Sequence, residues 1–261
     1  RMIRPFILRR LKGDVLKDLP EKIEENVFAR LDGEQMQLYD AYATRMKEML
    51  SQQNEKEFQK GRMQILSELT KLRQLCCDPG LLLEDYHGES AKTDMCMELI
   101  VNAVGAGHKI LLFSQFTSML DRLTERLKKE GIDYYLLTGS VNKEKRMQMV
   151  ESFNNDDVPV FCISLKAGGT GLNLTSADIV IHYDPWWNVA VENQATDRAH
   201  RIGQKNVVTV YKLIAKGTIE EKIIKLQQMK KELAEEILSG DEIKTASFQR
   251  EELLELLEER F

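Results

Sequence analysis

The chain has 261 residues, of which 43% are hydrophobic and 30% are charged, as is usual for a soluble globular protein. Its apolar runs are far shorter than a membrane span and it carries no secretory signal pattern, so we expect an intracellular protein (cytoplasm, nucleoid or nucleus) with no membrane partner. The net charge of −5 neither requires nor excludes a nucleic-acid partner, because residues 241–261 alone hold seven acidic and three basic residues.

The chain opens with a basic segment, residues 1–18, and an extended crossing is expected over residues 24–31. Apolar residues at helical spacing then predict helices over residues 34–50 and 55–77. Two successive helices without an intervening strand predict an antiparallel helical pair, in which the Met and Leu stripes serve packing.

From residue 92 onward, helical patterns alternate with short apolar strand patterns, which predicts an α/β fold with a doubly wound parallel sheet. In such sheets ligands bind beyond the carboxyl ends of the strands. A long helix over residues 217–238 and a short acidic helix over residues 251–259 close the chain. The strands are expected at residues 109–113, 134–137, 158–163, 179–182 and 207–214, with helices at 93–106, 117–130, 143–153 and 191–201.

The four cysteines have no spacing that suits zinc, so the sequence predicts no metal site and favours buried free thiols in a reducing compartment. His182 and His200 have no cysteine or carboxylate partner at catalytic or metal-binding spacing. We interpret both histidines as structural polar groups.

Residues 194–204 read Gln-Ala-Thr-Asp-Arg-Ala-His-Arg-Ile-Gly-Gln. Arg198 and Arg201 are three residues apart, so a helix would turn both guanidinium groups to one face. Guanidinium groups match phosphate oxygens well, and Gln194 and Asp197 stand beside them, so the pair could bind a polyphosphate. A solvated helix face with an Asp–Arg pair is the alternative.

Residues 164–173 hold three glycines and Lys166 directly after a predicted strand, so backbone N–H groups could approach a phosphate there. A glycine-rich turn without a ligand is the alternative. Residues 184–188 carry both tryptophans of the chain, which serve either core packing or stacking on nucleic acid.

The chain does not read as a complete ATPase. Residues 105–109 fail the phosphate-loop pattern, because His108 separates the glycine from the lysine and the segment precedes a strand. The Asp241-Glu242 pair follows a helix, so it does not suit a magnesium motif at a strand end. Arginines and a glycine loop without the lysine and magnesium carboxylates indicate half of a two-part nucleotide site.

Several segments resemble, in order and spacing, the second RecA-like lobe of Swi/Snf-type ATPases in helicase superfamily two. They are residues 113–116, 137–140, 164–173, 184–188 and the highly specific 197–204. The resemblance implies a RecA-like doubly wound parallel sheet in residues 92–216. It implies a connector from a missing lobe one in residues 1–33, a helical protrusion in 34–91, and a brace helix with an acidic tail in 217–261.

The resemblance also implies roles. Arg198 and Arg201 match arginine fingers that reach ATP held, with Mg²⁺, by lobe one. Gln194, Gly171 and Asn173 match nucleotide-binding positions. The positions that match the DNA-binding side are Ser114, Gln115, Thr138, Gly139, Lys166 and Trp187. Val189 departs from the proline that is usual in the family.

The sequence therefore predicts the second motor lobe of an ATP-dependent double-stranded DNA translocase, and we expect a piece of a longer protein that is inactive alone. Its expected partners are double-stranded DNA, lobe one of the same polypeptide and, as an open point, a DNA-bound protein cargo. The alternatives are a strand-separating helicase lobe and a non-enzymatic docking module that uses the acidic tail.

Overall fold

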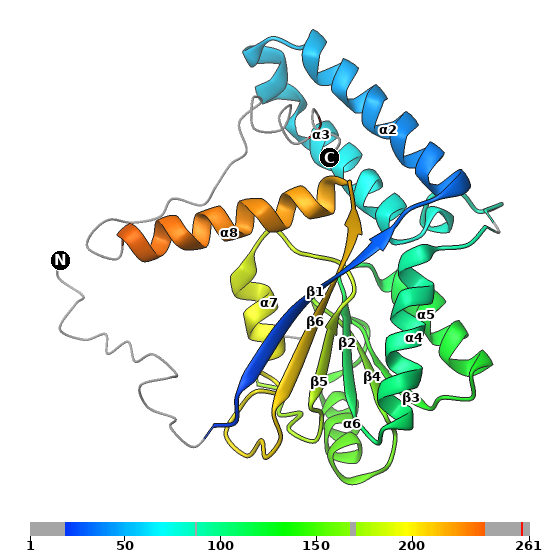
Figure 1. The fold of residues 1–261 in the computed structure, drawn as a ribbon, viewed down its shortest axis with the longest axis vertical. Coiled ribbons are helices and arrows are strands. Elements are labelled where there is room, and N and C mark those ends of the chain that lie inside the picture. Colours follow the sequence, from blue (N-terminus) through cyan, green and yellow to red (C-terminus); the bar gives the residue numbers. More distant parts are fainter. Residues whose placement is uncertain (1–18, 87, 168–170, 238–256, 258–261) are drawn as a thin grey trace.

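The computed structural model describes residues 19–86, 88–167 and 171–237 together with Leu257 (Figure 1). The basic segment 1–18 and most of the predicted acidic helix 251–259 lie outside the described residues. The elements in chain order are β1 (Lys22–Arg30), α2 (Gly33–Gln52), α3 (Glu55–Cys77), the 3-10 helix η2 (Pro79–Leu81), α4 (Ala91–Gly105), β2 (Ile110–Ser114), α5 (Thr117–Lys129), β3 (Tyr134–Leu137), α6 (Lys143–Asn155), β4 (Val160–Ser164), β5 (Ile179–His182), α7 (Val189–Thr196), β6 (Val208–Lys216) and α8 (Ile219–Ile237).

Six strands form one sheet in the order β1-β6-β5-β2-β4-β3, and every pairing is parallel. This is the predicted α/β class, because helices connect the strands and lie against the sheet. β3 and β5 have the bounds that the sequence predicted.

The segment predicted as an extended crossing is a strand of this sheet. β1 pairs with β6 from Lys22 opposite Val208 to Arg30 opposite Lys216, so it is an edge strand. It lies within the predicted connector, residues 1–33, yet it continues the sheet of the lobe.

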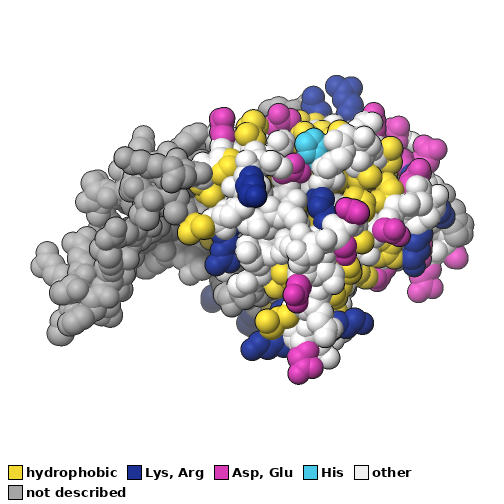
Figure 2. Space-filling view, turned by 90° about the horizontal axis from the view of Figure 1, so that it is seen from below, with side chains coloured by type: hydrophobic (Ala, Val, Ile, Leu, Met, Phe, Trp, Pro, Cys, Tyr) yellow, Lys and Arg dark blue, Asp and Glu magenta, His cyan; other side chains and the backbone are white. Residues whose placement is uncertain are grey.

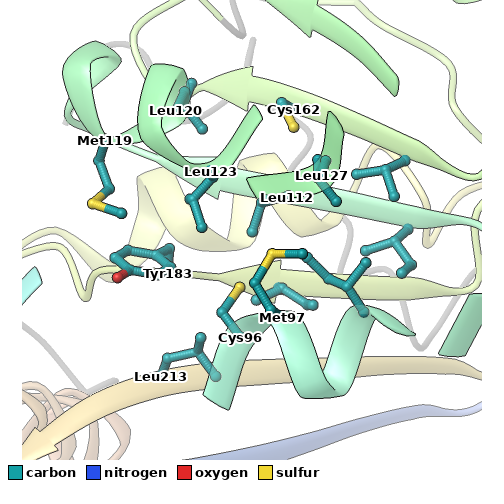
Figure 3. Packing of buried hydrophobic residues seen from close by; sticks show 14 of the residues in the cluster. Cys96, Met97, Leu112, Met119, Leu120, Leu123, Leu127, Cys162, Tyr183 and Leu213 are labelled. Carbon is teal, nitrogen blue, oxygen red and sulfur yellow. The ribbon is translucent and has the colours of Figure 1, made fainter. Parts of the chain in front are cut away.

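Alternate residues of the central strands face opposite sides of the sheet. In β2, Ile110 and Leu112 pack against α4 and α5, whereas Leu111 and Phe113 pack into the cluster that includes residues of α6 and α7. Figure 3 shows the first side, where Leu112 and Cys162 of the sheet meet leucines of α5. Both faces are buried, which explains the uninterrupted apolar runs.

A third cluster joins the helical pair α2–α3 to α8. A capping box begins α3: Asn54 accepts a hydrogen bond from the Glu57 N–H at 3.0 Å, and Glu57 accepts one from the Asn54 N–H at 2.9 Å. Figure 1 shows α2, α3 and α8 at the end of the sheet to which β1 and β6 point. Leu257 packs against this cluster as well.

A fully buried ion pair connects these parts. Nζ of Lys92, in the first turn of α4, lies 2.7 Å from both carboxylate oxygens of Glu220 in the first turn of α8. Burial lowers the pKa of Lys92, but Glu220, Cys77 and Asp184 together outweigh burial and raise this pKa above its ordinary value. Glu220 also accepts a hydrogen bond from the Ala215 N–H at the end of β6.

Within the part of the chain that the structure describes, no helix combines the length and the apolar character that crossing a membrane demands.

We expect Lys92→Met to lower the free energy of unfolding by about 3–5 kcal/mol, because it leaves the Glu220 carboxylate buried without its counter-charge. Urea unfolding of the chain measures this loss. Arg126→Met is the control, because its pair with Asp94 is exposed and such pairs contribute about 0–1 kcal/mol. Equal losses in the two variants would contradict the assigned role of the buried pair.

Candidate nucleotide and nucleic-acid site

The loops after β2, β4 and β3 lie side by side, because their strands are neighbours in the sheet. The Leu165 N–H donates to the Ser114 carbonyl at 2.9 Å, which joins two of these loops directly. Figure 2 shows the opposite end of the molecule, where the described basic and acidic side chains are interspersed. The predicted DNA-side residues lie at the carboxyl edge. The segment of Arg198 and Arg201 instead runs from α7 back towards the starts of β1 and β5, because His200 Nε2 lies 2.8 Å from the carbonyl of Pro20 and Gln204 Nε2 donates to the carbonyl of Ala177.

The predicted helix through Arg201 is wrong, because α7 ends at Thr196. Turns follow, in which the Arg198 N–H donates to Ala195 O and the Arg201 N–H donates to Ala199 O. The two arginines consequently share no helix face: Arg198 is 6% exposed, whereas Arg201 is exposed.

Arg198 is a buried cation that has no counter-charge within the part of the chain that the structure describes. Its Nε and Nη1 atoms are buried and have no hydrogen-bond partner among the described residues. Burial and, second, the positive charge of Arg146 lower the pKa of Arg198 to about 10, so the guanidinium remains charged at neutral pH. A buried guanidinium with free N–H groups is a ready site for an anion.

Arg146 is the residue that the sequence reading missed. It lies in the first turn of α6, and its Nη2 is 3.5 Å from Val141 O. Its Nε is buried and has no partner in the described parts of the chain. In the sequence, Arg146 follows Lys143 and Lys145 at the start of a predicted helix, where basic side chains are usually solvated. No local pattern indicated that the Arg146 side chain would be partly buried. The fold brings it to Arg198, because α6 and the segment after α7 pack into the same cluster.

The other predicted nucleotide positions are exposed around these arginines. Gly171 has a φ of 102°, a conformation that favours glycine. Asn173 accepts a hydrogen bond through its carbonyl from Asn154 of α6 at 2.7 Å, and the Leu174 N–H donates to Arg198 O at 3.0 Å. These bonds attach the loop to α6 and to Arg198, while the Gln194 side chain on α7 stays exposed.

Ser114 is not accessible for the DNA contact that the sequence predicted. It is fully buried, and its hydroxyl donates to Asp184 Oδ1 at 2.5 Å. The Gln115 N–H donates to the same carboxylate at 3.3 Å. Gln115 keeps one side-chain atom, Nε2, buried and without a partner among the described residues. Of these two, Gln115 retains a free donor for a phosphate.

The remaining predicted backbone-binding residues are accessible. Gly139 and Lys166 are exposed, and the half-buried Thr138 hydroxyl lies 2.8 Å from the Ser140 hydroxyl. Lys166 and Gly139 follow the neighbouring strands β4 and β3, so they occupy one edge.

Trp186 and Trp187 are half-buried beside the helical pair. Trp187 packs against the cluster of α2, α3 and α8. The Trp186 N–H donates to Glu192 Oε1 at 2.6 Å, and its carbonyl accepts a hydrogen bond from the Gln227 amide of α8. Packing therefore accounts for part of each ring, and stacking on nucleic acid stays a prediction.

His182 contacts the residue at which α7 ends, just before Arg198. Its Nε2 lies 2.9 Å from the hydroxyl of Thr196, and its ring stacks on Phe113. Burial and the charge of Lys212 lower the pKa of His182 to about 3, so it is neutral at physiological pH. His200 Nε2 lies 2.8 Å from the Pro20 carbonyl.

Comparison with known proteins gives the family. The sequence matches the Helicase conserved C-terminal domain over residues 91–203 and the SNF2-related domain over residues 1–81. The solved C-terminal domain of a Sulfolobus solfataricus SWI2/SNF2 ATPase is 36% identical with a TM-score of 0.68, over 85% of this chain and 91% of that domain. This chain belongs to the SWI2/SNF2 family. Its sheet is the RecA-like fold of the C-terminal helicase lobe.

Two further relatives of this SWI2/SNF2 lobe are longer. The S. solfataricus SWI2/SNF2 ATPase core in complex with double-stranded DNA is 37% identical with a TM-score of 0.71, over 91% of this chain and 51% of that one. The "Uncharacterized ATP-dependent helicase" of Mycoplasma pneumoniae is 44% identical over 259 residues, which is 97% of this chain. The lobe spans 24% of that curated relative's length.

The stability of the SWI2/SNF2 lobe is expected to fall as the pH drops from 6.5 towards 3. In this interval the unfolded chain protonates His182, whose ordinary pKa is 6.5, whereas the folded chain does not until about pH 3. The slope from this residue is up to about 1.4 kcal/mol per pH unit. Urea unfolding across this range should give a shallower pH dependence for His182→Asn than for the parent chain, and identical slopes would contradict the assignment.

Proposed function

We propose that this SWI2/SNF2 lobe is the second motor lobe of an ATP-dependent double-stranded DNA translocase. In this proposal, lobe one of the same polypeptide holds ATP and Mg²⁺, and Arg198 and Arg201 act on the terminal phosphate. The carboxyl-edge loops bind the DNA backbone. The proposed units remain residues 1–33, 34–91, 92–216 and 217–261, with β1 contributed to the sheet by the first of them.

The observation that carries the proposal is the buried Arg198 guanidinium, which lies near a second arginine, Arg146. Two of its nitrogen atoms, Nε and Nη1, find no hydrogen-bond partner in residues 19–86, 88–167 and 171–237. Like charges at a buried site are unfavourable unless an anion joins them. A triphosphate supplies such an anion, and charge spreads over its terminal oxygens during phosphoryl transfer. Donors fixed in advance stabilise that charge without reorganisation.

The site is proposed to be shared between two lobes. Among the described residues, no cluster of three or more His, Cys, Asp or Glu side chains could hold a metal ion, so Mg²⁺ is assigned to lobe one. The sequence likewise has no phosphate-loop lysine. We therefore expect the isolated chain to bind the phosphate weakly and not to hydrolyse ATP.

On the DNA side, Lys166, Gly139, Thr138 and Gln115 occupy neighbouring loops at one edge of the sheet. Contacts of this kind fix a protein on the duplex without reading sequence. The S. solfataricus SWI2/SNF2 core solved with double-stranded DNA supports a duplex as the partner. In the proposed cycle, closure on ATP and reopening after hydrolysis shift these loops along the backbone.

We expect Arg198→Ala and Arg201→Ala each to lower DNA-stimulated ATP turnover by about 10³-fold or more, as for other arginine fingers, with ATP binding largely retained. Arg146→Ala should lower turnover by a smaller factor. The measurement is steady-state ATPase activity of the longer protein that carries both lobes, with Arg45→Ala on the exposed face of α2 as the control. Near-normal turnover in both finger variants would leave the docking module as the better reading.

A second readout needs only this chain. Arg198→Met removes a buried charge that lacks a partner among the residues described, so urea unfolding should show a gain in stability, on the order of 1–3 kcal/mol. A large loss of stability would mean that Arg198 holds the fold together, and its loss of turnover would then carry no mechanistic meaning.

Lys166→Glu is expected to weaken binding to every duplex sequence alike and to flatten the salt dependence of binding, because one phosphate contact is lost. Fluorescence anisotropy with two duplexes of unrelated sequence, at several salt concentrations, measures both effects. Lys129→Glu, exposed at the last turn of α5, is the control with the same charge change. A loss confined to one of the duplexes would contradict binding through the backbone.

A further inference from the structure

Arg73 is a buried arginine that the proposed ATP and DNA contacts do not use. It lies near the end of α3 and is 3% exposed. Its Nη2 donates to the carbonyl of Pro185 at 2.5 Å and lies 3.7 Å from Oδ2 of Asp184. It therefore reaches from the helical pair into the loop that follows β5.

Three aromatic rings surround the guanidinium of Arg73. Its central carbon lies 5.4 Å from the ring centre of Trp186, 5.7 Å from that of Phe116 and 5.9 Å from that of Trp187. A planar cation at these distances is attracted to each ring face, more strongly where water is excluded. Phe116 belongs to the loop after β2 and both tryptophans belong to the loop after β5, so one side chain of α3 contacts two carboxyl-edge loops.

Charge balance alone does not account for this arrangement. Asp184 is fully buried, and Arg73 opposes the rise of its pKa that burial causes. Yet Asp184 also accepts hydrogen bonds from the Ser114 hydroxyl and the Gln115 N–H. A lysine could supply the same charge, whereas a flat guanidinium can bond to Pro185 and lie against the rings together.

We propose that Arg73 is a positioning residue that fixes Trp186 and Trp187 at the DNA-facing edge, so that the helical pair sets how these rings meet the duplex. This inference rests on the proposed function of the lobe. Backbone bonds to Glu192 and Gln227 hold the loop itself. Arg73 sets the position of the rings. Because Arg73 belongs to α3, a movement of the helical pair would change that position.

Trp186 and Trp187 are the two tryptophans of the chain, so its intrinsic fluorescence reports on these rings. The test variant is the double substitution Arg73→Met and Asp184→Asn, which removes the guanidinium without leaving a buried carboxylate uncompensated. The amide oxygen that replaces the carboxylate can still accept the hydrogen bond from Ser114. Arg45→Met, on the exposed face of α2, is the control with the same side-chain change.

The double variant is expected to keep the far-ultraviolet circular dichroism of the parent chain. Its tryptophan emission should shift to the red and its acrylamide quenching should rise. Its affinity for a duplex should fall about tenfold, within the range that aromatic stacking on nucleic acid contributes. Parental emission, quenching and affinity in the folded double variant would overturn the proposal and reduce Arg73 to a counter-charge for Asp184.

Arg73→Lys is the second variant, and it decides the matter if the double variant does not fold. It keeps the charge beside Asp184 and loses the planar group, so quenching should still rise and affinity should still fall. Parental values in Arg73→Lys would overturn the proposal. Failure of the parent chain and of the longer protein to bind duplex DNA would count against the proposed function, whereas the fluorescence changes test Arg73 independently of DNA.

Discussion

The structure depends on one buried ion pair, Lys92 with Glu220. Both side chains are fully buried, and they join the first helix of the lobe to the helix that follows its last strand. The Lys92 ammonium also lies over the ring of Tyr183, whose hydroxyl donates to the carbonyl of Cys77 at the end of α3. Burial of two charges is tolerable only when geometry and additional hydrogen bonds are good, and both conditions hold here. The helical pair, the sheet and α8 are consequently held in one arrangement.

Two arginines outside this ion pair show the opposite condition. Lys92 has its counter-charge within the fold, whereas Arg198 and Arg146 have buried N–H groups without one among the described residues. Functional sites commonly keep such unfavourable features, because the missing partner is the ligand. Under the proposed function, that ligand is a phosphate that another lobe presents. In that proposal, the stability that this lobe gives up at Arg198 is recovered when the two lobes close on the nucleotide.

Buried polar groups also link the proposed DNA side to the helical pair. Asp184 accepts hydrogen bonds from the loop after β2 and lies beside Arg73 from α3, so the loop positions depend on residues outside the sheet. Ser114 belongs to this interior set. Under the proposed function, the exposed residues Lys166 and Gly139 contact the DNA backbone. In the proposal, residues that contact DNA and residues that position the loops therefore alternate within the same short loops.

The sequence by itself determined the local structure and the family. Alternating apolar runs predicted the strands because both faces of a parallel sheet are buried, and the phrase at residues 197–204 indicated the Swi/Snf resemblance that the comparisons confirm. Only the tertiary structure decided that β1 completes the sheet, that α7 stops before Arg198, that Ser114 is buried, that Arg146 approaches Arg198, and that Arg73 contacts the loop after β5. Each of these depends on which segments distant in sequence come into contact, and on how much water their contact excludes. A local pattern of residues contains neither quantity.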